Sequence, residues 1–173
     1  MEHLWAPWRM DYVAGPPVEG CVLCQAGQRE TADDYVVYRG EHNFVILNRF
    51  PYNSGHLMVV PYEHLSDMTA LSGEQLGEMM EIAQGVLETF SQCLRPDGAN
   101  LGMNLGRAAG AGIESHLHLH IIPRWHGDTN FITTVGETRV VPQALDACAR
   151  VVEPILREVM GRRTSQVSSP DSE

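Results

Sequence analysis

Residues 116–122 alternate between histidine and apolar residues, in the order His-Leu-His-Leu-His-Ile-Ile. A period of two residues indicates a β-strand, because successive side chains of a strand point to opposite faces. Leu117, Leu119 and Ile121 would then enter a hydrophobic core, while three imidazoles share the other face. Three inert histidines side by side are costly to bury. The segment therefore predicts a half-buried strand whose polar face carries function.

Other strands are predicted upstream of this segment. Residues 35–38, 44–47 and 56–60 are apolar and rich in β-branched or aromatic side chains, a composition typical of strands. The loop 48–55 contains Pro, Asn and Gly, which favour turns, so the two strands that it joins should form an antiparallel pair. A further strand is expected at 99–105.

Two helices complete the predicted fold. Ser72 and Gln75 match a capping box, and apolar residues recur behind them at helical spacing until Pro96 stops the helix. A second helix is expected after Pro142. Because strands and helices are segregated along the chain, the sequence indicates an α+β fold, with helices packed on an antiparallel sheet.

The chain length suits one domain with irregular ends. Its 173 residues can enclose a single hydrophobic core. Prolines and glycines interrupt residues 1–20, which are expected to form an irregular N-terminal arm. Residues 21–161 would form the folded domain with its C-terminal helix. The polar residues 162–173 are expected to be a disordered tail.

The charge balance limits the classes of partner. The formal net charge is −10, which argues against a nucleic-acid partner, because binding to its phosphate backbone needs a basic face. No apolar run approaches the roughly 20 residues of a membrane span. The N-terminus also lacks the basic and apolar regions of a signal peptide. A cytoplasmic protein that binds no membrane is therefore expected.

Two kinds of chemistry fit three imidazoles on one strand face. They could bind a catalytic metal, as in a metallohydrolase, or one could be a nucleophile whose neighbours hold a phosphate. The glycine-rich residues 106–112 just before the strand favour the second, because exposed backbone N–H groups can approach phosphate oxygens closely. A metallohydrolase should also show more carboxylate ligands, and only Glu114 is close in sequence.

The four cysteines are expected to be thiols or metal ligands, since disulfides are rare in the cytoplasm. Cys21 and Cys24 form a C-x-x-C pair, which fits a zinc site or two free thiols. A thioredoxin-like redox site is disfavoured, because its helix-rich context is not predicted after Cys24. Cys93 and Cys148 lie in predicted helical stretches and are expected to be buried packing residues.

The histidine segment resembles the signature of the histidine-triad (HIT) superfamily, in which three histidines alternate with other residues and two apolar residues follow. The resemblance extends over about residues 44–124, which keep the family order of strands, Asn-containing loop, helix and glycine loop. The flanks 4–9 and 123–131 resemble the bacterial branch that is similar to diadenosine tetraphosphate (Ap4A) phosphorylase. The resemblance implies a HIT-like fold and a homodimer or higher homo-oligomer.

The resemblance also implies roles for three histidines. His118 would attack an α-phosphorus and form a nucleotidyl-histidine intermediate, while a backbone carbonyl keeps its other nitrogen protonated. A neutral imidazole suits this step, because it is nucleophilic near pH 7 and leaves readily from phosphorus. His120 and His56 would help to hold the phosphate oxygens.

A set of substrate-binding residues follows from the same resemblance: Asn48, Asn104, Gly110, Gly112 and Ser115. Asn48 matches a position that hydrogen-bonds ribose. Asn104 matches a phosphate-contacting position where many relatives have Gln. The family's usual Gln four residues before the first histidine is replaced here by Gly112, and Ser115 or Arg107 are the candidates to compensate.

A structural zinc site is a further implication. In the zinc-bearing members, and in the related galactose-1-phosphate uridylyltransferase, two cysteines join a histidine after the second strand and the first triad histidine. The corresponding residues here are Cys21, Cys24, His64 and His116. Two thiolates and two imidazoles fill a tetrahedral Zn²⁺ shell, so no position is left for a catalytic water.

The expected reaction is cleavage of Ap4A with inorganic phosphate, which gives ATP and ADP. Water in place of phosphate would make the protein a dinucleoside polyphosphate hydrolase or a nucleoside phosphoramidase. A non-catalytic nucleotide-binding module is an alternative of another class. Arg107 and Arg124 are the nearest cations in sequence that could screen the two anions from each other.

Overall fold

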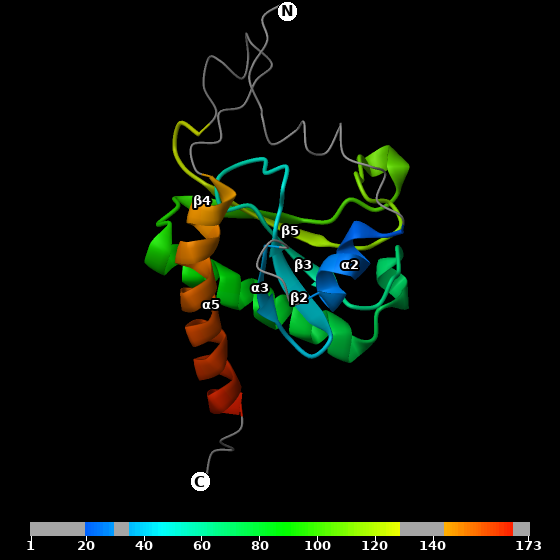
Figure 1. The fold of residues 1–173 in the computed structure, drawn as a ribbon, viewed down its shortest axis with the longest axis horizontal. Helices are drawn as coiled ribbons and strands as arrows, with labels where there is room; N and C mark the ends of the chain where they lie inside the picture. The colour runs from blue at the N-terminus through cyan, green and yellow to red at the C-terminus, as the bar shows by residue number, and fades with distance from the viewer. Residues whose placement is uncertain (1–19, 30–34, 129–143, 168–173) are drawn as a thin grey trace, which may run out of the picture.

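The structure is a computed structural model that describes residues 20–29, 35–128 and 144–167. Its centre is a five-stranded antiparallel sheet in the order β1-β2-β3-β5-β4 (Figure 1). The strands are β1 (Val36–Arg39), β2 (Asn43–Leu47), β3 (Leu57–Pro61), β4 (Gly98–Gly102) and β5 (Leu119–Arg124). The α-helices are α2 (Val22–Gln28), α3 (Gly73–Cys93) and α5 (Leu145–Val167), with the short 3-10 turns η2 (Met68–Ala70) and η3 (Arg107–Ala109). The predicted α+β fold is confirmed.

The central strands are buried on both faces. β2 pairs with β3 through five residue pairs, from Asn43 opposite Pro61 to Leu47 opposite Leu57. Alternate residues such as Val45 and Val59 enter one apolar cluster, and Phe44 and Met58 enter another on the opposite face. Because each face of the sheet has its own apolar cluster, other elements of the fold must cover both faces.

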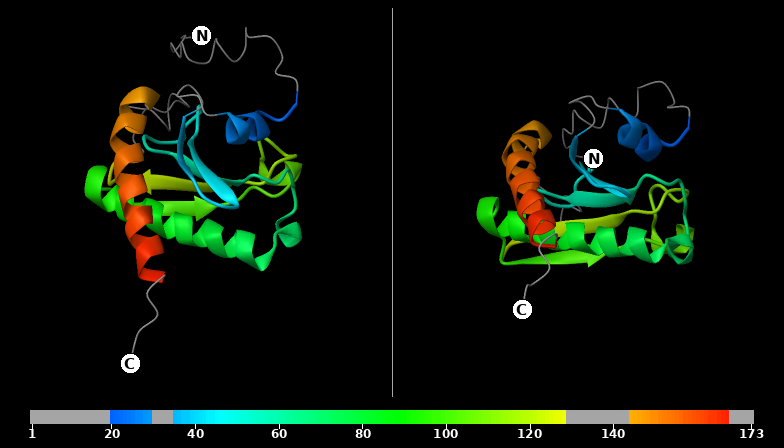
Figure 2. Two further views of the ribbon diagram at one scale, coloured as in Figure 1. Left: turned by 60° about the horizontal axis from the view of Figure 1, so that its bottom comes forward. Right: turned by 90° about the horizontal axis from the view of Figure 1, so that it is seen from below.

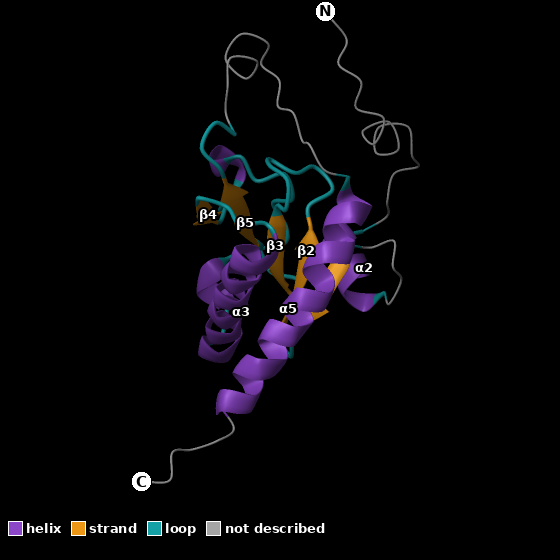
Figure 3. Cartoon of the chain, turned by 90° about the vertical axis from the view of Figure 1, so that its left-hand side faces the viewer, coloured by secondary structure: helices purple, strands orange, loops and turns teal. Residues whose placement is uncertain are grey.

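Helices α3 and α5 cover the first face (Figure 3). The predicted capping box is confirmed, since Ser72 accepts a hydrogen bond from the Gln75 N–H and Gln75 reaches back to the Ser72 N–H. Helix α3 ends at Cys93, just before Pro96, as predicted. The long helix after Pro142 is also confirmed as α5.

Helix α2 covers the opposite face, where Leu23 and Ala26 pack against Phe44 and Met58 (Figure 2). No local pattern in the sequence predicts this helix of seven residues. The Arg39 guanidinium holds its C-terminal end by donating to the carbonyl oxygens of Ala26, Gly27 and Arg29. A cation there satisfies carbonyls that have no partner inside the helix. The C-x-x-C pair therefore lies at the start of a helix that is fixed to the sheet.

The bounds of β1, β2 and β3 differ from the predicted ones by a single residue, whereas those of β5 and β4 differ by more. The strand predicted at 116–122 begins only at Leu119, because the Leu117 N–H pairs with the Leu65 carbonyl outside the sheet, at 2.7 Å. The strand predicted at 99–105 spans Gly98–Gly102. It ends where its neighbour begins, since Gly102 lies opposite His120.

Helix α5 is longer than predicted, because it continues past the predicted boundary after residue 161 to Val167. Arg162 forms ion pairs with Glu158 and with Glu88 of α3. Such pairs stabilise a polar helical turn that composition alone assigns to a tail. The rest of the predicted tail, and nearly all of the predicted N-terminal arm, lie outside the described residues. Within the described part, no helix has the length and apolar character needed to cross a membrane.

Candidate active site and metal centre

Three of the singled-out histidines form one buried cluster on the α2 side of the sheet. His56 directly precedes β3, His120 lies on β5, and the two strands are paired. The His56 Nε2 and His120 Nδ1 atoms are 2.9 Å apart. The His118 ring meets the His120 ring edge-on, with ring centroids 4.7 Å apart. The structure thus brings His56, His118 and His120 together, although His56 and His118 are 62 positions apart in the sequence.

Burial keeps two of these imidazoles neutral. It is the main cause that lowers the pKa of His56 to about 3, and the neighbouring rings of His120 and His118 lower it further. Burial, followed by the His118 ring, lowers the pKa of His120 to about 4. A neutral imidazole carries one N–H donor and one acceptor nitrogen, so the partners of each ring determine where its proton resides.

The backbone fixes the proton on His56. The Tyr52 N–H donates to His56 Nδ1 at 3.1 Å, so Nδ1 is the acceptor and Nε2 carries the proton. His56 Nε2 then donates to His120 Nδ1. His120 must in turn carry its proton on Nε2. That atom is buried and has no hydrogen-bond partner among the described residues. The chain of contacts from Tyr52 therefore ends in an N–H donor that lacks an acceptor.

His118 has the opposite arrangement. Its Nδ1 donates to the His116 carbonyl oxygen at 2.8 Å, which leaves the lone pair on Nε2. The expectation that a backbone carbonyl holds the second nitrogen is confirmed. That carbonyl is available because residues 116–118 lie outside the strand ladder. The later start of β5 thus leaves this carbonyl free of the ladder pairing that a strand residue would have.

A second cluster contains Cys21, Cys24, His64 and His116, whose ligand atoms all lie within 4.8 Å of one another. His116 Nδ1 is 3.3 Å from the Cys21 sulfur and 3.4 Å from the Cys24 sulfur. The His64 Nδ1 is 3.1 Å from the Cys24 sulfur. Tetrahedral zinc geometry separates a sulfur and a nitrogen ligand by about 3.5 Å. The four predicted residues therefore fit one metal ion.

The protonation of His116 suits this cluster. Its Nε2 donates to the Pro61 carbonyl oxygen at 2.9 Å, so the lone pair lies on Nδ1, toward the two sulfurs. Burial is the main cause that lowers the pKa of His116, and burial also raises the pKa of the Cys24 thiol. A cation would offset that second shift, because the thiolate is the form that binds metal.

Of the remaining substrate-binding candidates, Asn48 contacts the histidine cluster. Asn48 is half-buried, and its Nδ2 is 3.4 Å from His56 Nδ1. The others, on the segment between β4 and His116, are Asn104, Gly110, Gly112 and Ser115. Asn104 is half-buried, and the other three are exposed. Within the described residues, no hydrogen bond joins these four to the histidine cluster.

The two arginines expected near the site, Arg107 and Arg124, differ in exposure and in how closely a carboxylate binds them. Arg107 is 91% exposed and lies 3.7 Å from the Glu114 carboxylate. Arg124 is bound by the Asp128 carboxylate through Nε at 2.6 Å and Nη2 at 2.7 Å. Because Asp128 balances its charge, Arg124 is the weaker of the two candidate cations for an anionic acceptor. The i,i+4 spacing of Arg124 and Asp128 was the sequence signal for this pair.

Sequence reasoning also missed two contributors to the cluster. Tyr52 acts through its backbone N–H, which no side-chain pattern reveals. Its ring also lies 4.9 Å from the His56 ring, centroid to centroid. The Asn53 backbone carbonyl oxygen accepts a hydrogen bond from the backbone N–H of His56 at 3.2 Å. Both residues lie in a segment that was assigned only as a loop.

Comparison with known proteins places this arrangement in a family. The model of the family described as "HIT domain" matches residues 29–127. A Mycobacterium tuberculosis protein named AP-4-A phosphorylase is 38% identical over an alignment that covers 88% of this chain and 83% of the relative.

Solved structures agree with the sequence relatives. A Zn-bound histidine triad family protein from Mycobacterium smegmatis matches with a TM-score of 0.65 at 27% identity, over 83% of this chain and 97% of the other. A hypothetical histidine triad nucleotide-binding protein from Sulfolobus tokodaii gives the same TM-score at 28% identity. That match covers 88% of this chain and all of the other.

Proposed function

The chain belongs to the HIT family, and from that premise we propose that it cleaves dinucleoside polyphosphates, such as Ap4A, by nucleotidyl transfer through His118. The observation that carries this proposal is the contact between His118 Nδ1 and the His116 carbonyl oxygen. It leaves a lone pair on Nε2 of a buried ring, which is the form of imidazole that attacks phosphorus. The similarity to the M. tuberculosis protein supports the choice of substrate.

In the first step, His118 Nε2 forms a bond to the α-phosphorus of Ap4A. The bond from that phosphorus to the bridging oxygen breaks, and its electron pair leaves with ATP. Adenylyl-His118 remains on the protein. The unpaired Nε2–H of His120 is a donor for an oxygen of the transferred phosphoryl group, where negative charge accumulates.

In the second step, an oxygen of inorganic phosphate attacks the same phosphorus. The P–N bond breaks, ADP leaves, and His118 regains its lone pair. Two anions must approach each other here, and their repulsion is reduced by N–H donors and cations. The exposed loop with Gly110 and Gly112 supplies donors, and the exposed Arg107 is the candidate cation. Water at the same place would give AMP instead.

Product analysis tests this reaction. The protein is incubated with Ap4A, with and without inorganic phosphate, and the nucleotides are separated by chromatography. ATP plus ADP formed only with phosphate is the expected result. ATP plus AMP in both samples would identify a hydrolase. Nucleotide binding without any product would identify a non-catalytic binding module.

We also propose that Cys21, Cys24, His64 and His116 hold a structural Zn²⁺. The distances, the lone pair on His116 Nδ1 and the Zn-bound relative support this assignment. When bound, the ion supplies no chemistry to the transfer step, because four protein ligands close its shell. Instead it ties the start of α2 to the segment that ends at His118. Metal analysis of the purified protein should find about one zinc per chain.

A homodimer through the β4 edge is the proposed assembly. β4 is the outer strand of the sheet, next to β5. Leu101 of β4 and Met80 and Leu87 of α3 expose 41%, 47% and 37% of their surface. An edge that pairs with no further described strand, together with exposed apolar residues on β4 and α3, favours pairing with a second copy. Sedimentation velocity should show a species of twice the chain mass or a higher multiple, and a monomer at all concentrations would exclude this assembly.

A further inference from the structure

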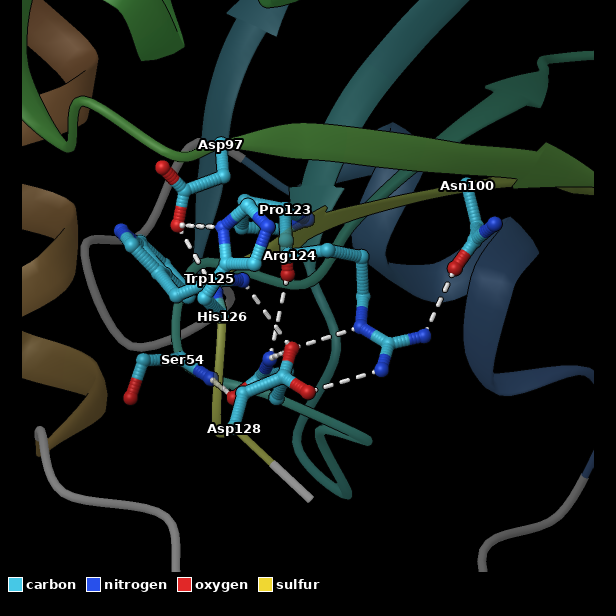
Figure 4. Close-up of polar contacts among 9 residues, drawn as sticks. Ser54, Asp97, Asn100, Pro123, Arg124, Trp125, His126 and Asp128 are labelled. Carbon is cyan, nitrogen blue, oxygen red and sulfur yellow. Dashed lines mark hydrogen bonds and ion pairs between the residues drawn. The ribbon is translucent and has the colours of Figure 1, made fainter.

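A polar network joins the end of β5 to the loop before His56 (Figure 4). At its centre is the Asp128 carboxylate, whose side chain is only 10% exposed. Arg124 binds both of its oxygens, at 2.6 and 2.7 Å. The Trp125 N–H donates to Oδ2 at 3.1 Å. Arg124 also donates to Asn100 Oδ1 on β4 at 2.9 Å, so the network is fixed to the sheet.

The same carboxylate holds Asn53. The Asn53 Nδ2 donates to Asp128 Oδ2 at 2.8 Å and to the Pro123 carbonyl oxygen at 3.1 Å. On its other side, Asn53 Oδ1 accepts the Ser54 N–H at 3.1 Å. Both ends of this amide are therefore engaged, which fixes its rotation and the backbone that carries it.

The backbone of Asn53 in turn fixes the position of His56. Its carbonyl oxygen accepts the His56 N–H at 3.2 Å and closes a tight turn through Gly55, whose φ is +78°. Gly55 is packed so closely that an added Cβ would lie 2.6 Å from the Leu94 side chain. The turn therefore has one geometry. It presents the Tyr52 N–H to His56 Nδ1, the contact that determines the protons of His56 and His120.

We propose that Asp128 and Arg124 are positioning residues, which act through Asn53 to orient the turn before His56 and so keep the N–H of His120 directed at the reacting phosphate. An exposed ion pair on a loop would contribute little. This one differs, because its carboxylate is largely buried and is shared by a guanidinium, a backbone amide and a side-chain amide. Such a set of charge-assisted hydrogen bonds specifies one geometry.

The kinetic consequence rests on the proposed nucleotidyl transfer, and Asp128→Asn tests it. This variant keeps the shape of the side chain but replaces an acceptor oxygen with a donor that faces Arg124 or Asn53. We expect kcat for Ap4A to fall about tenfold or more, because misplacement by a fraction of an ångström weakens transition-state contacts. KM should stay within about twofold, since ground-state binding is retained.

Asp97→Asn is the matched control. Asp97 also accepts hydrogen bonds from the turn after β5, from His126 N at 2.7 Å and His126 Nδ1 at 3.0 Å. Its carboxylate does not contact Asn53, and its side chain is 50% exposed. This variant should keep wild-type kcat. Equal losses of kcat in the two variants would reduce the role of Asp128 to general stability of the turn.

A double-mutant cycle and the imidazole ¹⁵N signals complete the test. Asn53→Ala combined with Asp128→Asn should lose no more kcat than the stronger single variant, because both break one contact. In Asp128→Asn, the ring signals of His56 and His120 should shift or broaden as the proton placement becomes mixed. Unchanged ring signals and unchanged kcat would overturn the proposal. If the wild-type protein cleaves no Ap4A, the transfer proposal fails, while the ring signals still decide the positioning role.

Discussion

Two clusters meet in residues 116–118, yet they use imidazole in opposite ways. One is the cluster of His56, His118 and His120, called the reactive cluster after its proposed role. The other is the cysteine–histidine cluster of Cys21, Cys24, His64 and His116. His116 donates a hydrogen bond from Nε2 to the Pro61 carbonyl oxygen, and its Nδ1 faces two sulfurs. His118 donates a hydrogen bond from Nδ1 to the His116 carbonyl oxygen, and its lone pair is on Nε2. The backbone acceptor, rather than the type of side chain, therefore separates the proposed metal ligand His116 from the proposed nucleophile His118.

The two clusters should also respond differently to mutation. In the proposed reaction the reactive cluster contributes contacts to a transition state, so its loss should appear in kcat. The cysteine–histidine cluster links α2 to the catalytic segment, so its loss should appear in stability. The following predictions test that separation, in order of expected effect.

His118→Ala should have the largest effect. Without the Nε2 nucleophile no covalent intermediate forms, and kcat should fall by about a thousandfold or more. Nucleotide affinity, measured by calorimetry, should stay close to that of the wild type. His126→Ala is the control, because that side chain is 93% exposed. Retention of a substantial part of kcat in His118→Ala would transfer the nucleophilic role to another residue.

Cys21→Ser should affect stability rather than chemistry. Loss of a structural metal should lower the free energy of unfolding by about 2 kcal/mol or more, which corresponds to a Tm lower by about 5 °C for a chain of this size. Activity per folded molecule should be largely retained. Cys93→Ser is the control, since Cys93 donates to the Thr89 carbonyl within α3, away from the cluster. Equal Tm values and equal zinc content in both variants would contradict the proposed site.

The protonation of the reactive cluster can be measured directly. Because their pKa values are lowered to about 3 and about 4, His56 and His120 should stay neutral as the pH falls to about 5. The unfolded chain takes up these protons near pH 6.5, before the folded chain does, so stability should fall as the pH drops from about 6.5 toward 4. Ring signals of His56 or His120 that titrate near pH 6.5 in the folded protein would show that the cluster is hydrated.

Arg107→Gln should have the smallest effect. Arg107 is almost fully exposed, so its neutralisation should leave Tm unchanged. If Arg107 reduces the repulsion between incoming phosphate and the bound nucleotide, phosphate should accelerate Ap4A cleavage about twofold to threefold less in the variant. Nucleotide affinity should stay nearly constant. Arg157→Gln, on α5 and paired with Glu153, is the control. The same loss in both variants would indicate a general effect of net charge.

Much of the fold follows from local patterns in the sequence. The Ser72 capping box, the stop before Pro96 and the apolar strands depend on neighbours within a few residues, and these predictions are confirmed. Errors occurred where distant segments decide the outcome. The start of β5 depends on Leu65, the end of β4 on where β5 begins, and the extent of α5 on Glu88. Helix α2 is too short to be stable without the sheet beneath it.

In the candidate site, too, local sequence patterns and contacts between distant segments decide different properties. The sequence by itself determined which residue types are available: the histidines at 116, 118 and 120, His56, and a cysteine pair with metal-binding chemistry. Only the tertiary structure decided how each is used, because an imidazole takes its proton placement from its hydrogen-bond partners. Those partners are the Pro61 carbonyl, the His116 carbonyl and the Tyr52 N–H. Every residue has a backbone carbonyl and every residue but proline a backbone N–H, so their influence is set by the path of the chain and leaves no pattern in the sequence.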